Sequence, residues 1–569
     1  MEIAIEASMP TYSGGLGVLA GDTIRSAADL ELPMVAVCPL YRKGYFYQKL
    51  DDEGRQSEEP MEWVVDDYLT ELPPRVTVPI EGREVEIRAW KFDVEGRSGH
   101  SVPVIFLDTD LPENAEQDRE LSHHLYGGDQ RYRLCQEVVL GIGGVKMLDA
   151  LGYDAIDRYH MNEGHAALLT LALLNRSAAA HGRTHVTEED AADVRENCLF
   201  TTHTPVPAGH DTFPMDLVAQ VLPNRDEADD DQLDYTVNLA QTALELGDND
   251  SAPTQEGVLN MTHLALGLSH YVNGVAKKHG EVSREMFNDP SVDSITNGVH
   301  VRTWVTPPFQ EIFDRHLPDW RDDSFALRNA FRVPRRDVWE AHQEAKKAMI
   351  ADVQQRTNVA LDHDAFTIGF ARRVAPYKRA DLLFSDIDRL RRIAEDAGPL
   401  QVVMAGKAHP KDQRGKEIIQ RIFDARDALN GAVKIAFLSN YDMTVTGTMI
   451  GGVDLWLNTP RPPNEASGTS GMKAALNGVP QLSTLDGWWL EGWIESVTGW
   501  AIGQLGDDKN PDPVRHADSI YGKLEHIILP LYYDDRSRFI DVMRHAIALN
   551  GSFFHTQRMV DEYVVKAYL

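Results

Sequence analysis

The chain has 569 residues and a mass of 63.7 kDa, more than one ordinary hydrophobic core accommodates, so two large domains are expected. Its formal net charge of −32 disfavours binding to nucleic acid or to acidic membranes. The apolar runs are of strand length, the N-terminus shows no basic leader, and the three cysteines show no pairing or metal-ligand spacing, which together indicate a reducing cytoplasm.

The excess of acidic residues has two readings that the sequence leaves open. It is typical of a protein adapted to a salt-rich cytoplasm, where ions screen the repulsion between carboxylates. It is equally typical of an acidic protein from a GC-rich genome. The densest acidic run, residues 226–231, is expected to be a solvated loop.

The first half of the chain reads as alternating strands and helices. A glycine turn over residues 12–20 opens a helix, residues 76–90 form an antiparallel hairpin around Glu81-Gly82, and residues 131–151 form a long buried helix. A further helix is predicted over residues 262–276. Short strands are predicted over residues 3–7, 34–38, 102–107, 198–202 and 294–299.

The second half shows a cleaner alternation, which predicts a parallel βαβ sheet. Its strands are expected over residues 366–371, 400–405, 433–438, 453–458 and 480–483. Helices are expected over residues 412–428, 443–450, 520–529 and 536–549, with a last one that runs to about residue 568. The sequence therefore predicts a mixed α/β protein of two domains, divided near residue 300.

A loop of small residues in the second half carries one lysine. Residues 465–478 read Glu-Ala-Ser-Gly-Thr-Ser-Gly-Met-Lys-Ala-Ala-Leu-Asn-Gly and join a predicted strand to a predicted helix. Such a loop presents backbone N–H groups and the positive end of a helix dipole, which suits an anion. Lys473 lies about one turn inside the helix, so its amine can reach the same pocket. On its own, the segment is as typical of a flexible loop with a solvated lysine.

Three other loops at the ends of predicted strands carry chemistry, because ligands of parallel sheets bind at these ends. Gly-Gly-Leu-Gly at 14–17 is a candidate backbone cradle for an anion, although Gly-Gly turns are common. Residues 372–379 hold four cations, which favours an oxyanion site over a solvated basic loop in so acidic a chain. Thr-His-Thr-Pro at 202–205 ends a strand with an imidazole, although a lone histidine is more often structural.

These four loops, in this order, resemble those of the α-glucan phosphorylases, the family of the glycogen, starch and maltodextrin phosphorylases. The resemblance covers nearly the whole chain and is closest to the compact branch without regulatory extensions. Other shared motifs are Val-Asn-Gly-Val-Ala-Lys at 272–277, Thr-Asn-Gly at 296–298, Gly-Lys-Ala at 406–408, Asn-Tyr at 440–441 and Thr-Leu-Asp-Gly at 484–487. Asp442 and Ala375 depart from the pattern, since larger members carry arginine and histidine there.

The resemblance implies a GT-B fold, in which two Rossmann-like domains face each other across a deep cleft. Residues 1–300 would form an N-terminal α/β domain with the glucan site and the phosphate cradle. Residues 301–569 would form a Rossmann-like domain that binds pyridoxal 5′-phosphate, followed by C-terminal helices. The implied reaction is phosphorolysis of α-1,4-glucan at its non-reducing ends by inorganic phosphate, which releases glucose 1-phosphate with retention.

The resemblance also assigns roles to single residues. Lys473 would carry pyridoxal 5′-phosphate as a Schiff base, while the phosphate of this cofactor would serve as the acid/base group. The catalytic set is Lys473, Arg373, Lys378 and His203, of which Arg373 and Lys378 would bind substrate phosphate. Further cofactor contacts would come from Thr469, Ser470, Tyr441 and Trp304. Substrate contacts would come from His203, Gly15, Leu16, Asn297, Glu465, Ser467 and Gly468.

Three alternative functions can be compared with this assignment. A nucleotide-sugar glycosyltransferase of the glycogen or starch synthase type shares the architecture, but it usually carries a second glutamate eight residues after the first, where this chain has Lys473. A non-catalytic carbohydrate-binding protein would use Trp488, Trp489 and Trp493, yet the cation set is intact. No metal site is expected, because His160 and His165 are five residues apart and would not share a helical face.

The expected partners are α-1,4-glucan and inorganic phosphate, with no nucleic acid and no membrane, and homo-oligomer formation is left open.

Overall fold

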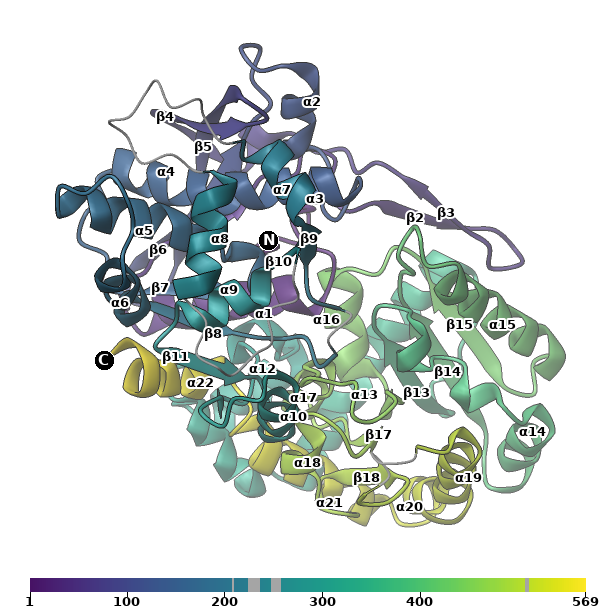
Figure 1. The fold of residues 1–569 in the computed structure, drawn as a ribbon. Coiled ribbons are helices and arrows are strands. Elements are labelled where there is room, and N and C mark those ends of the chain that lie inside the picture. Colours follow the sequence, from purple (N-terminus) through teal and green to yellow (C-terminus); the bar gives the residue numbers. More distant parts are fainter. Residues whose placement is uncertain (207–208, 224–235, 247–256, 507–510) are drawn as a thin grey trace. The chain divides into compact units, whose positions relative to one another are not determined.

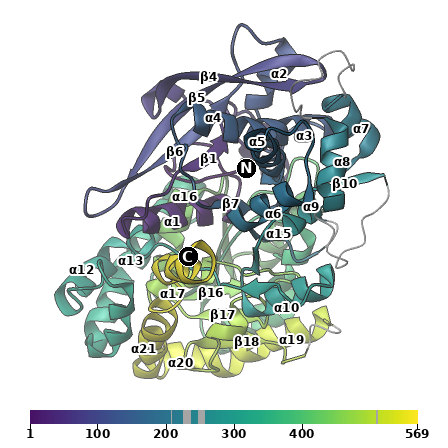
Figure 2. The same ribbon diagram turned by 60° about the vertical axis from the view of Figure 1, so that its left-hand side comes forward.

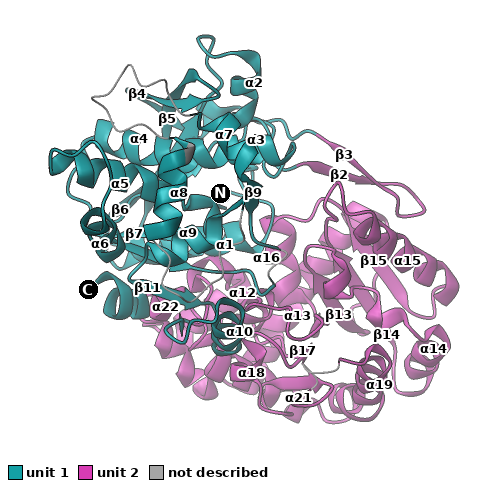
Figure 3. Ribbon diagram, viewed as in Figure 1, with its two compact units in different colours: residues 1–45, 60–295, 560–569 teal, residues 46–59, 296–559 magenta. Residues whose placement is uncertain are grey.

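The computed structural model describes residues 1–206, 209–223, 236–246, 257–506 and 511–569 (Figure 1). The acidic run at 226–231 lies outside these residues. The chain divides into two compact units, coloured in Figure 3: unit 1 is Met1–Tyr45, Pro60–Ile295 and Val560–Leu569, and unit 2 is Phe46–Glu59 and Thr296–Met559. Among the described residues, no helix combines the length and the hydropathy that crossing a bilayer requires.

The first sheet of unit 1 has the strand order β1-β6-β5-β4. β1 (Ala36–Pro39) is parallel to β6 (Ser101–Asp108), and β5 (Arg83–Glu95) is antiparallel to both β6 and β4 (Thr70–Ile80). The predicted hairpin is confirmed: Glu81 and Gly82 join β4 to β5 with φ of 52° and 73°, as a turn with two positive φ angles requires.

The second sheet of unit 1 is wholly parallel, with the order β12-β11-β8-β7. Its strands are β7 (Tyr159–Asn162), β8 (Cys198–Thr201), β11 (Tyr271–Gly274) and β12 (Asp293–Ser294). The helix predicted over residues 262–276 is wrong in its second half. The observed helix, α9 (Met261–Gly267), ends at Gly267, and the residues that follow form β11, which pairs with β8. The aromatic and β-branched pair Tyr271-Val272 suits a strand better than a helix.

The strand predicted over residues 3–7 is also wrong. The backbone N–H groups of Ile3 and Ala4 donate to the carbonyls of Thr11 and Gly17, at 3.0 and 2.9 Å, rather than to a neighbouring strand.

The predicted helices at 12–20 and 131–151 are confirmed. The second is α3 (Gln130–Val138), a π turn and α4 (Gly144–Ala150) in unbroken succession. The remaining helices that lie within unit 1 are α1 (Gly15–Asp29), α2 (Glu116–Arg119), α5 (Leu169–Ala180), α6 (Glu188–Asn197), α7 (Met215–Val221), α8 (Val237–Leu246) and α10 (Lys277–Phe287).

Unit 2 is built on a six-stranded parallel sheet with the order β15-β14-β13-β16-β17-β18. Figure 2 shows β16, β17 and β18 in succession. The strands are β13 (Phe366–Ala371), β14 (Leu400–Ala405), β15 (Lys434–Leu438), β16 (Leu455–Asn458), β17 (Gln481–Thr484) and β18 (Gly499–Ile502). In chain order this is 3-2-1-4-5-6, the doubly wound arrangement, and its switch point lies between β13 and β16. The mixed α/β class with parallel sheets is confirmed.

Helices connect these strands and extend the unit toward its C-terminal end. Before the sheet come α11 (Val301–Trp304), α12 (Pro307–His316) and α13 (Arg335–Thr357). Within and after it come α14 (Ile387–Asp396), α15 (Gln413–Leu429), α16 (Met443–Gly452), α17 (Ser470–Leu476), α18 (Trp489–Gly492), α19 (Pro513–Lys523), α20 (Leu529–Tyr533) and α21 (Arg536–His545). The last helix, α22 (Thr556–Tyr563), begins in unit 2 and ends in unit 1. A separate two-stranded hairpin, β2 (Tyr47–Leu50) and β3 (Gln56–Glu59), also belongs to this unit.

A buried charge cluster ties α13 to the sheet. Asp454 accepts hydrogen bonds from Lys346 Nζ at 2.6 Å and from His342 Nε2 at 2.8 Å, and all three side chains are fully buried. Burial opposes ionisation of Asp454, but Lys346 and His342 outweigh it and lower the pKa of this carboxyl to about 2. The backbone N–H of Thr367 on β13 donates to the same carboxylate at 2.7 Å.

We predict that Asp454→Ala destabilises the protein by about 3–5 kcal/mol, because it leaves the ammonium of Lys346 buried without its counter-ion. Thermal unfolding measures this, with Arg336→Ala as control: the pair of Arg336 with Glu340 is exposed and is expected to contribute less than about 1 kcal/mol. Since the folded-state pKa of Asp454 is depressed, the wild-type contribution is present above pH 3.8 and is lost as pH falls through about 2. Equal melting temperatures for the two variants would contradict this assignment.

Candidate active site

The loops that follow β13 and β16 meet at the switch point of the unit 2 sheet. β13 ends at Ala371 and runs directly into the basic segment 372–379, while β16 ends at Asn458 and leads to the small-residue loop before α17. Because β13 and β16 are parallel neighbours, their carboxyl ends lie at the same edge. The sheet topology therefore brings the two predicted loops of this unit together.

One carboxylate joins both loops. Arg372 Nη2 donates to both oxygens of Glu465, at 3.0 and 2.9 Å, and Lys378 Nζ donates to Glu465 Oε2 at 2.5 Å. Arg372 Nη1 also donates to Asn458 Oδ1 at 3.1 Å. The Glu465 side chain is only 9% exposed, so this is a nearly dry cluster of two cations and one anion. The cluster keeps a surplus of positive charge, which suits a further anion.

A second carboxyl group supports the first. Asp486 Oδ2 accepts from the backbone N–H of Glu465 at 2.8 Å, and Asp486 Oδ1 accepts from that of Gly487 at 2.9 Å. Burial raises the pKa of Asp486 to about 7, and the charge of Glu465 adds to the rise. Burial alone would raise the pKa of Glu465, but the positive charges of Arg372 and Lys378 outweigh this effect, and the pKa is lowered. The two neighbouring carboxyls therefore titrate far apart, and Asp486 is the one that gains a proton near neutral pH.

Lys473 is buried on α17, with 5% of its surface exposed. Its Nζ lies 3.8 Å from the centre of the Trp304 ring, over the indole face. Asn477 fixes this arrangement, because its Nδ2 donates to the carbonyls of Trp304 and Lys473 at 2.8 and 3.0 Å. Its Oδ1 accepts from the N–H and hydroxyl of Thr306 at 2.7 and 2.9 Å. A primary amine is thus held against a flat aromatic surface, away from bulk water.

Two other predicted residues of unit 2, Ser467 and Asn297, present polar atoms that lack a partner among the described residues. The hydroxyl of Ser467 and the side-chain oxygen of Asn297 are buried and accept or donate no hydrogen bond there, and the same holds for Arg372 Nε. Ser470 Oγ accepts from Trp456 Nε1 at 3.1 Å. Unpartnered buried polar atoms suit a polar ligand, and the Lys473 amine over the Trp304 ring suits a flat aromatic one. The residues present therefore fit pyridoxal 5′-phosphate.

Two predicted residues sit at the margin of this arrangement. Arg373 is exposed, and it lies close enough to Tyr377 for its charge, together with that of Lys378, to lower the pKa of the Tyr377 phenol against the effect of burial. Tyr441 is half-buried, and desolvation raises the pKa of its phenol. The structure thus joins Lys378 to Glu465 and places Arg372, rather than Arg373, on the carboxylate.

The predicted glycine cradle of unit 1 already holds a carboxylate of the chain. Glu2 Oε2 accepts from the backbone N–H groups of Ser13 and Gly14 at 2.5 and 3.1 Å, at the start of α1. Glu2 Oε1 accepts from the Tyr126 hydroxyl at 3.1 Å. Gly15 is exposed and Leu16 is half-buried. The backbone N–H groups of this turn do bind an anion, as predicted. In this structure the anion is the carboxylate of Glu2 from the same chain.

His203 lies at the end of β8 in unit 1. Its Nε2 contacts Asn162 Oδ1 at 2.5 Å, and its backbone N–H donates to Glu163 Oε2 at 2.8 Å. The Thr204 hydroxyl donates to the same Glu163 oxygen at 2.9 Å. Burial lowers the pKa of His203 to about 3, so its imidazole is neutral at pH 7. Such a group serves hydrogen bonding rather than proton transfer.

Sequence reasoning missed three supporting residues. In the sequence, Arg372 is only one of four cations in its loop. Which of the adjacent residues Arg372 and Arg373 faces Glu465 depends on the course of the backbone, which the sequence does not show. Asp486 and Asn477 lie within motifs that were recognised, but a motif carries no information on which backbone groups their side chains satisfy. The sequence signal that points to Asp486 is its place before Gly487, just after a predicted strand.

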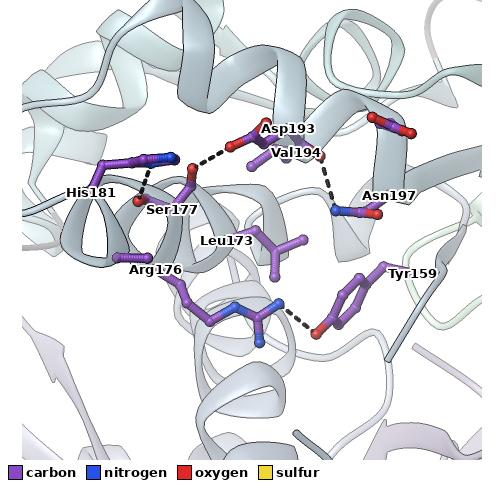
Figure 4. Close-up of a pocket in the computed structure, with 10 residues that line it drawn as sticks. Tyr159, Leu173, Arg176, Ser177, His181, Asp193, Val194 and Asn197 are labelled. Atoms are coloured by element: carbon purple, nitrogen blue, oxygen red, sulfur yellow. Dashed lines mark hydrogen bonds between the residues drawn. The ribbon is translucent and has the colours of Figure 1, made fainter. Parts of the chain in front are cut away.

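A surface cavity of about 300 Å³ lies elsewhere, in unit 1 between β7, α5 and α6 (Figure 4). Arg176 Nη2 donates to the Tyr159 hydroxyl at 2.7 Å, and the Ser177 hydroxyl donates to Asp193 at 3.0 Å across its wall. None of the predicted site residues lines it. The cavity is therefore separate from the candidate active site.

We predict that Asp486→Asn makes the protein relatively more stable as pH rises. The folded wild type holds a proton on Asp486 up to about pH 7, whereas the unfolded chain releases it near 3.8, so wild-type stability falls between these values. Asparagine carries no such charge. The stability difference, variant minus wild type, should grow by roughly 2–3 kcal/mol from pH 5 to pH 8. Melting curves across this range measure it, and a difference independent of pH would contradict the protonation of Asp486.

Known proteins match this chain over most or all of its length. The family model described as carbohydrate phosphorylase matches residues 153–498. The maltodextrin phosphorylase of Thermococcus litoralis is 39% identical over 604 residues, covering 100% of this chain and 70% of the relative. The glycogen phosphorylases of Mycobacterium tuberculosis and Aquifex aeolicus are each 36% identical, covering 100% of this chain and 70% and 85% of their own. These matches confirm the resemblance drawn from the loop motifs, and the chain belongs to the carbohydrate phosphorylase family.

Proposed function

We propose that this protein is an α-glucan phosphorylase that uses pyridoxal 5′-phosphate bound at Lys473. The observation that carries the proposal is the buried amine of Lys473 over the Trp304 ring, in a family whose named relatives act on glycogen or maltodextrin. The substrates are the non-reducing end of an α-1,4-glucan and inorganic phosphate. The products are glucose 1-phosphate and a glucan shorter by one unit.

The reaction needs one bond exchange and one proton. A phosphate oxygen bonds to the anomeric carbon with retention, the glucosidic C–O bond breaks, and the leaving 4-oxygen takes up a proton. The cofactor supplies a phosphate monoester whose second pKa is about 6, which can hold or release a proton near neutral pH. Backbone N–H groups of Thr469 and Ser470, at the start of α17, would hold that phosphate.

The main task of the protein is then charge balance. Two phosphates close together repel, and cations must offset this repulsion. Lys378 and Arg373 are the proposed partners of substrate phosphate, and Arg372 adds a third cation at the same edge. Because Glu465 neutralises only one of the two charges it contacts, the cluster retains attraction for phosphate.

The sugar side of the site needs hydrogen-bonding groups rather than charge. Asn297, Ser467 and Gly468 are proposed to contact the glucosyl hydroxyls, together with Glu465 in unit 2. The orphaned oxygens of Asn297 and Ser467 support this, because a sugar hydroxyl would satisfy them. In unit 1, Gly15, Leu16 and the neutral imidazole of His203 are proposed as further hydrogen-bonding contacts for the glucan.

The alternative is a glycosyltransferase that uses a nucleotide sugar. Such an enzyme usually carries a second glutamate eight residues after the one that corresponds to Glu465, and this position holds the buried Lys473. The lysine therefore favours the phosphorylase.

We predict that Lys473→Ala yields a folded protein that neither retains pyridoxal 5′-phosphate nor releases glucose 1-phosphate. The change removes the amine that anchors the cofactor. The test compares the absorption band of the bound cofactor and the release of glucose 1-phosphate from a maltooligosaccharide. Lys347→Ala, at an exposed lysine on α13, is the matched control and should behave as wild type. Undiminished phosphorolysis by Lys473→Ala would refute the proposal.

We predict that Arg373→Ala and Lys378→Ala each lower kcat/KM for phosphate by an amount equivalent to about 2–4 kcal/mol of transition-state stabilisation, as expected when one electrostatic donor is lost. Only Lys378→Ala should also lower the melting temperature, since Lys378 is buried against Glu465 and Arg373 is exposed. Initial rates at varied phosphate concentration give the first quantity. Wild-type phosphate kinetics in both variants would count against the assignment.

A further inference from the structure

The hairpin β2–β3 belongs to unit 2 although unit 1 flanks it on both sides in sequence. Its strands pair in antiparallel register, with Gln48 opposite Glu58 and Leu50 opposite Gln56. On its outer face Lys49 pairs with Glu59 at 2.6 Å, and both side chains are about half exposed. On its inner face Gln48 and Gln56 are buried, at 1% and 9% exposure. Two buried amides on one short hairpin need partners, since unpaired buried polar groups are costly.

The partners are backbone groups of two loops at the edge of the unit 2 sheet. Gln48 Nε2 donates to the Gly406 carbonyl at 2.9 Å, and Gln48 Oε1 accepts from the Asn440 N–H at 2.8 Å. Gln56 Nε2 donates to the Ala408 carbonyl at 2.8 Å, and Gln56 Oε1 accepts from the Ala408 N–H at 3.0 Å. The two amides also bond to each other at 2.9 Å. The glutamines thus act as backbone partners for loops 406–408 and 440–441.

Asn440 shows how closely one loop depends on the hairpin. Its φ is +53°, a left-handed conformation that non-glycine residues rarely adopt. Its side-chain Oδ1 accepts from the Gln48 N–H at 3.3 Å, while its own N–H donates to the Gln48 side chain. This reciprocal pair holds the backbone that presents Tyr441.

The other loop leads directly to the cation cluster. Gly406 passes so close to Arg372 that a Cβ at this position would lie 2.2 Å from the Arg372 carbonyl oxygen. The Val374 N–H donates to the Lys407 carbonyl at 2.9 Å, so residues 372–374 and 406–408 run as bonded neighbours. Lys407 Nζ in turn donates to the carbonyl of Phe46, the residue before β2, at 2.9 Å. A chain of contacts therefore runs from the hairpin to the backbone of Arg372.

We propose that Gln48 and Gln56 are positioning residues, which clamp loops 406–408 and 440–441 and thereby hold the Arg372–Lys378 segment in its phosphate-binding conformation. This inference rests on the proposed function of that segment. Neither glutamine contacts the reacting groups. When the clamp is lost, the loops spend part of their time in conformations that do not bind phosphate. The apparent affinity for phosphate then falls in proportion to the fraction of molecules that remain in the binding conformation. Turnover at saturating phosphate should be much less affected, because phosphate binding restores the competent state.

The test uses Gln48→Ala and Gln56→Ala in the full chain, loaded with cofactor. The matched controls are Lys49→Ala and Ser57→Ala, which alter neighbouring residues on the opposite, exposed face of the same hairpin. Hydrogen exchange measured by mass spectrometry reports the amides of Ala408 and Asn440. These should exchange about tenfold faster or more in the glutamine variants and at wild-type rates in the controls.

Initial rates at varied inorganic phosphate supply the second readout. We expect KM for phosphate to rise by about tenfold in the glutamine variants, with kcat within about twofold of wild type. Faster exchange with an unchanged KM would overturn the positioning role and leave the hairpin merely structural. Unchanged exchange at both amides would overturn the clamp itself. Absence of phosphorolysis in the wild type would refute the proposed function instead, and the exchange rates would still decide whether the hairpin holds the loops.

Discussion

The ion pair that Glu465 forms with both Arg372 and Lys378 is the interaction on which the rest of the site depends. It joins the loop after β13 to the loop after β16 at the switch point of a doubly wound sheet. Charges this deeply buried are tolerated only when paired and hydrogen-bonded, so the pairing fixes where both loops run. It also leaves the cluster with one positive charge in excess. The same cluster of Glu465, Arg372 and Lys378 therefore holds the two loops together and attracts anions.

Neighbouring polar groups hold this edge from several sides. Asp486 binds the backbone of Glu465, Asn477 ties Trp304 to the helix of Lys473, and the buried glutamines of the hairpin bind the loops beside Arg372. Each of these residues satisfies backbone groups rather than facing solvent. Such support keeps reactive groups in place before a ligand arrives, which reduces the reorganisation that a reaction would otherwise require.

The sequence predicted β13 and β14 of unit 2 well, because each is a short, mostly apolar run: both strands begin and end where expected. It did not predict β18, a strand of four residues, and it extended a helix across β11. In the candidate site, the motifs led to Lys473, Lys378 and Glu465. They could not reveal that Arg372 binds the carboxylate of Glu465, since this depends on the direction in which each arginine side chain projects from the backbone. Nor could they reveal that Gln48 and Gln56 bind loops more than 350 residues away in sequence.

The most direct test of the account is to locate the cofactor on the chain. The wild-type protein would be loaded with pyridoxal 5′-phosphate, reduced with borohydride, digested and mapped by mass spectrometry. The account predicts one stoichiometric adduct on Lys473. Lys347 and Lys434, exposed lysines of the same unit, would serve as internal controls and should stay unmodified. An unmodified Lys473, or adducts spread over exposed lysines, would contradict the assignment of this edge of the sheet as the active site.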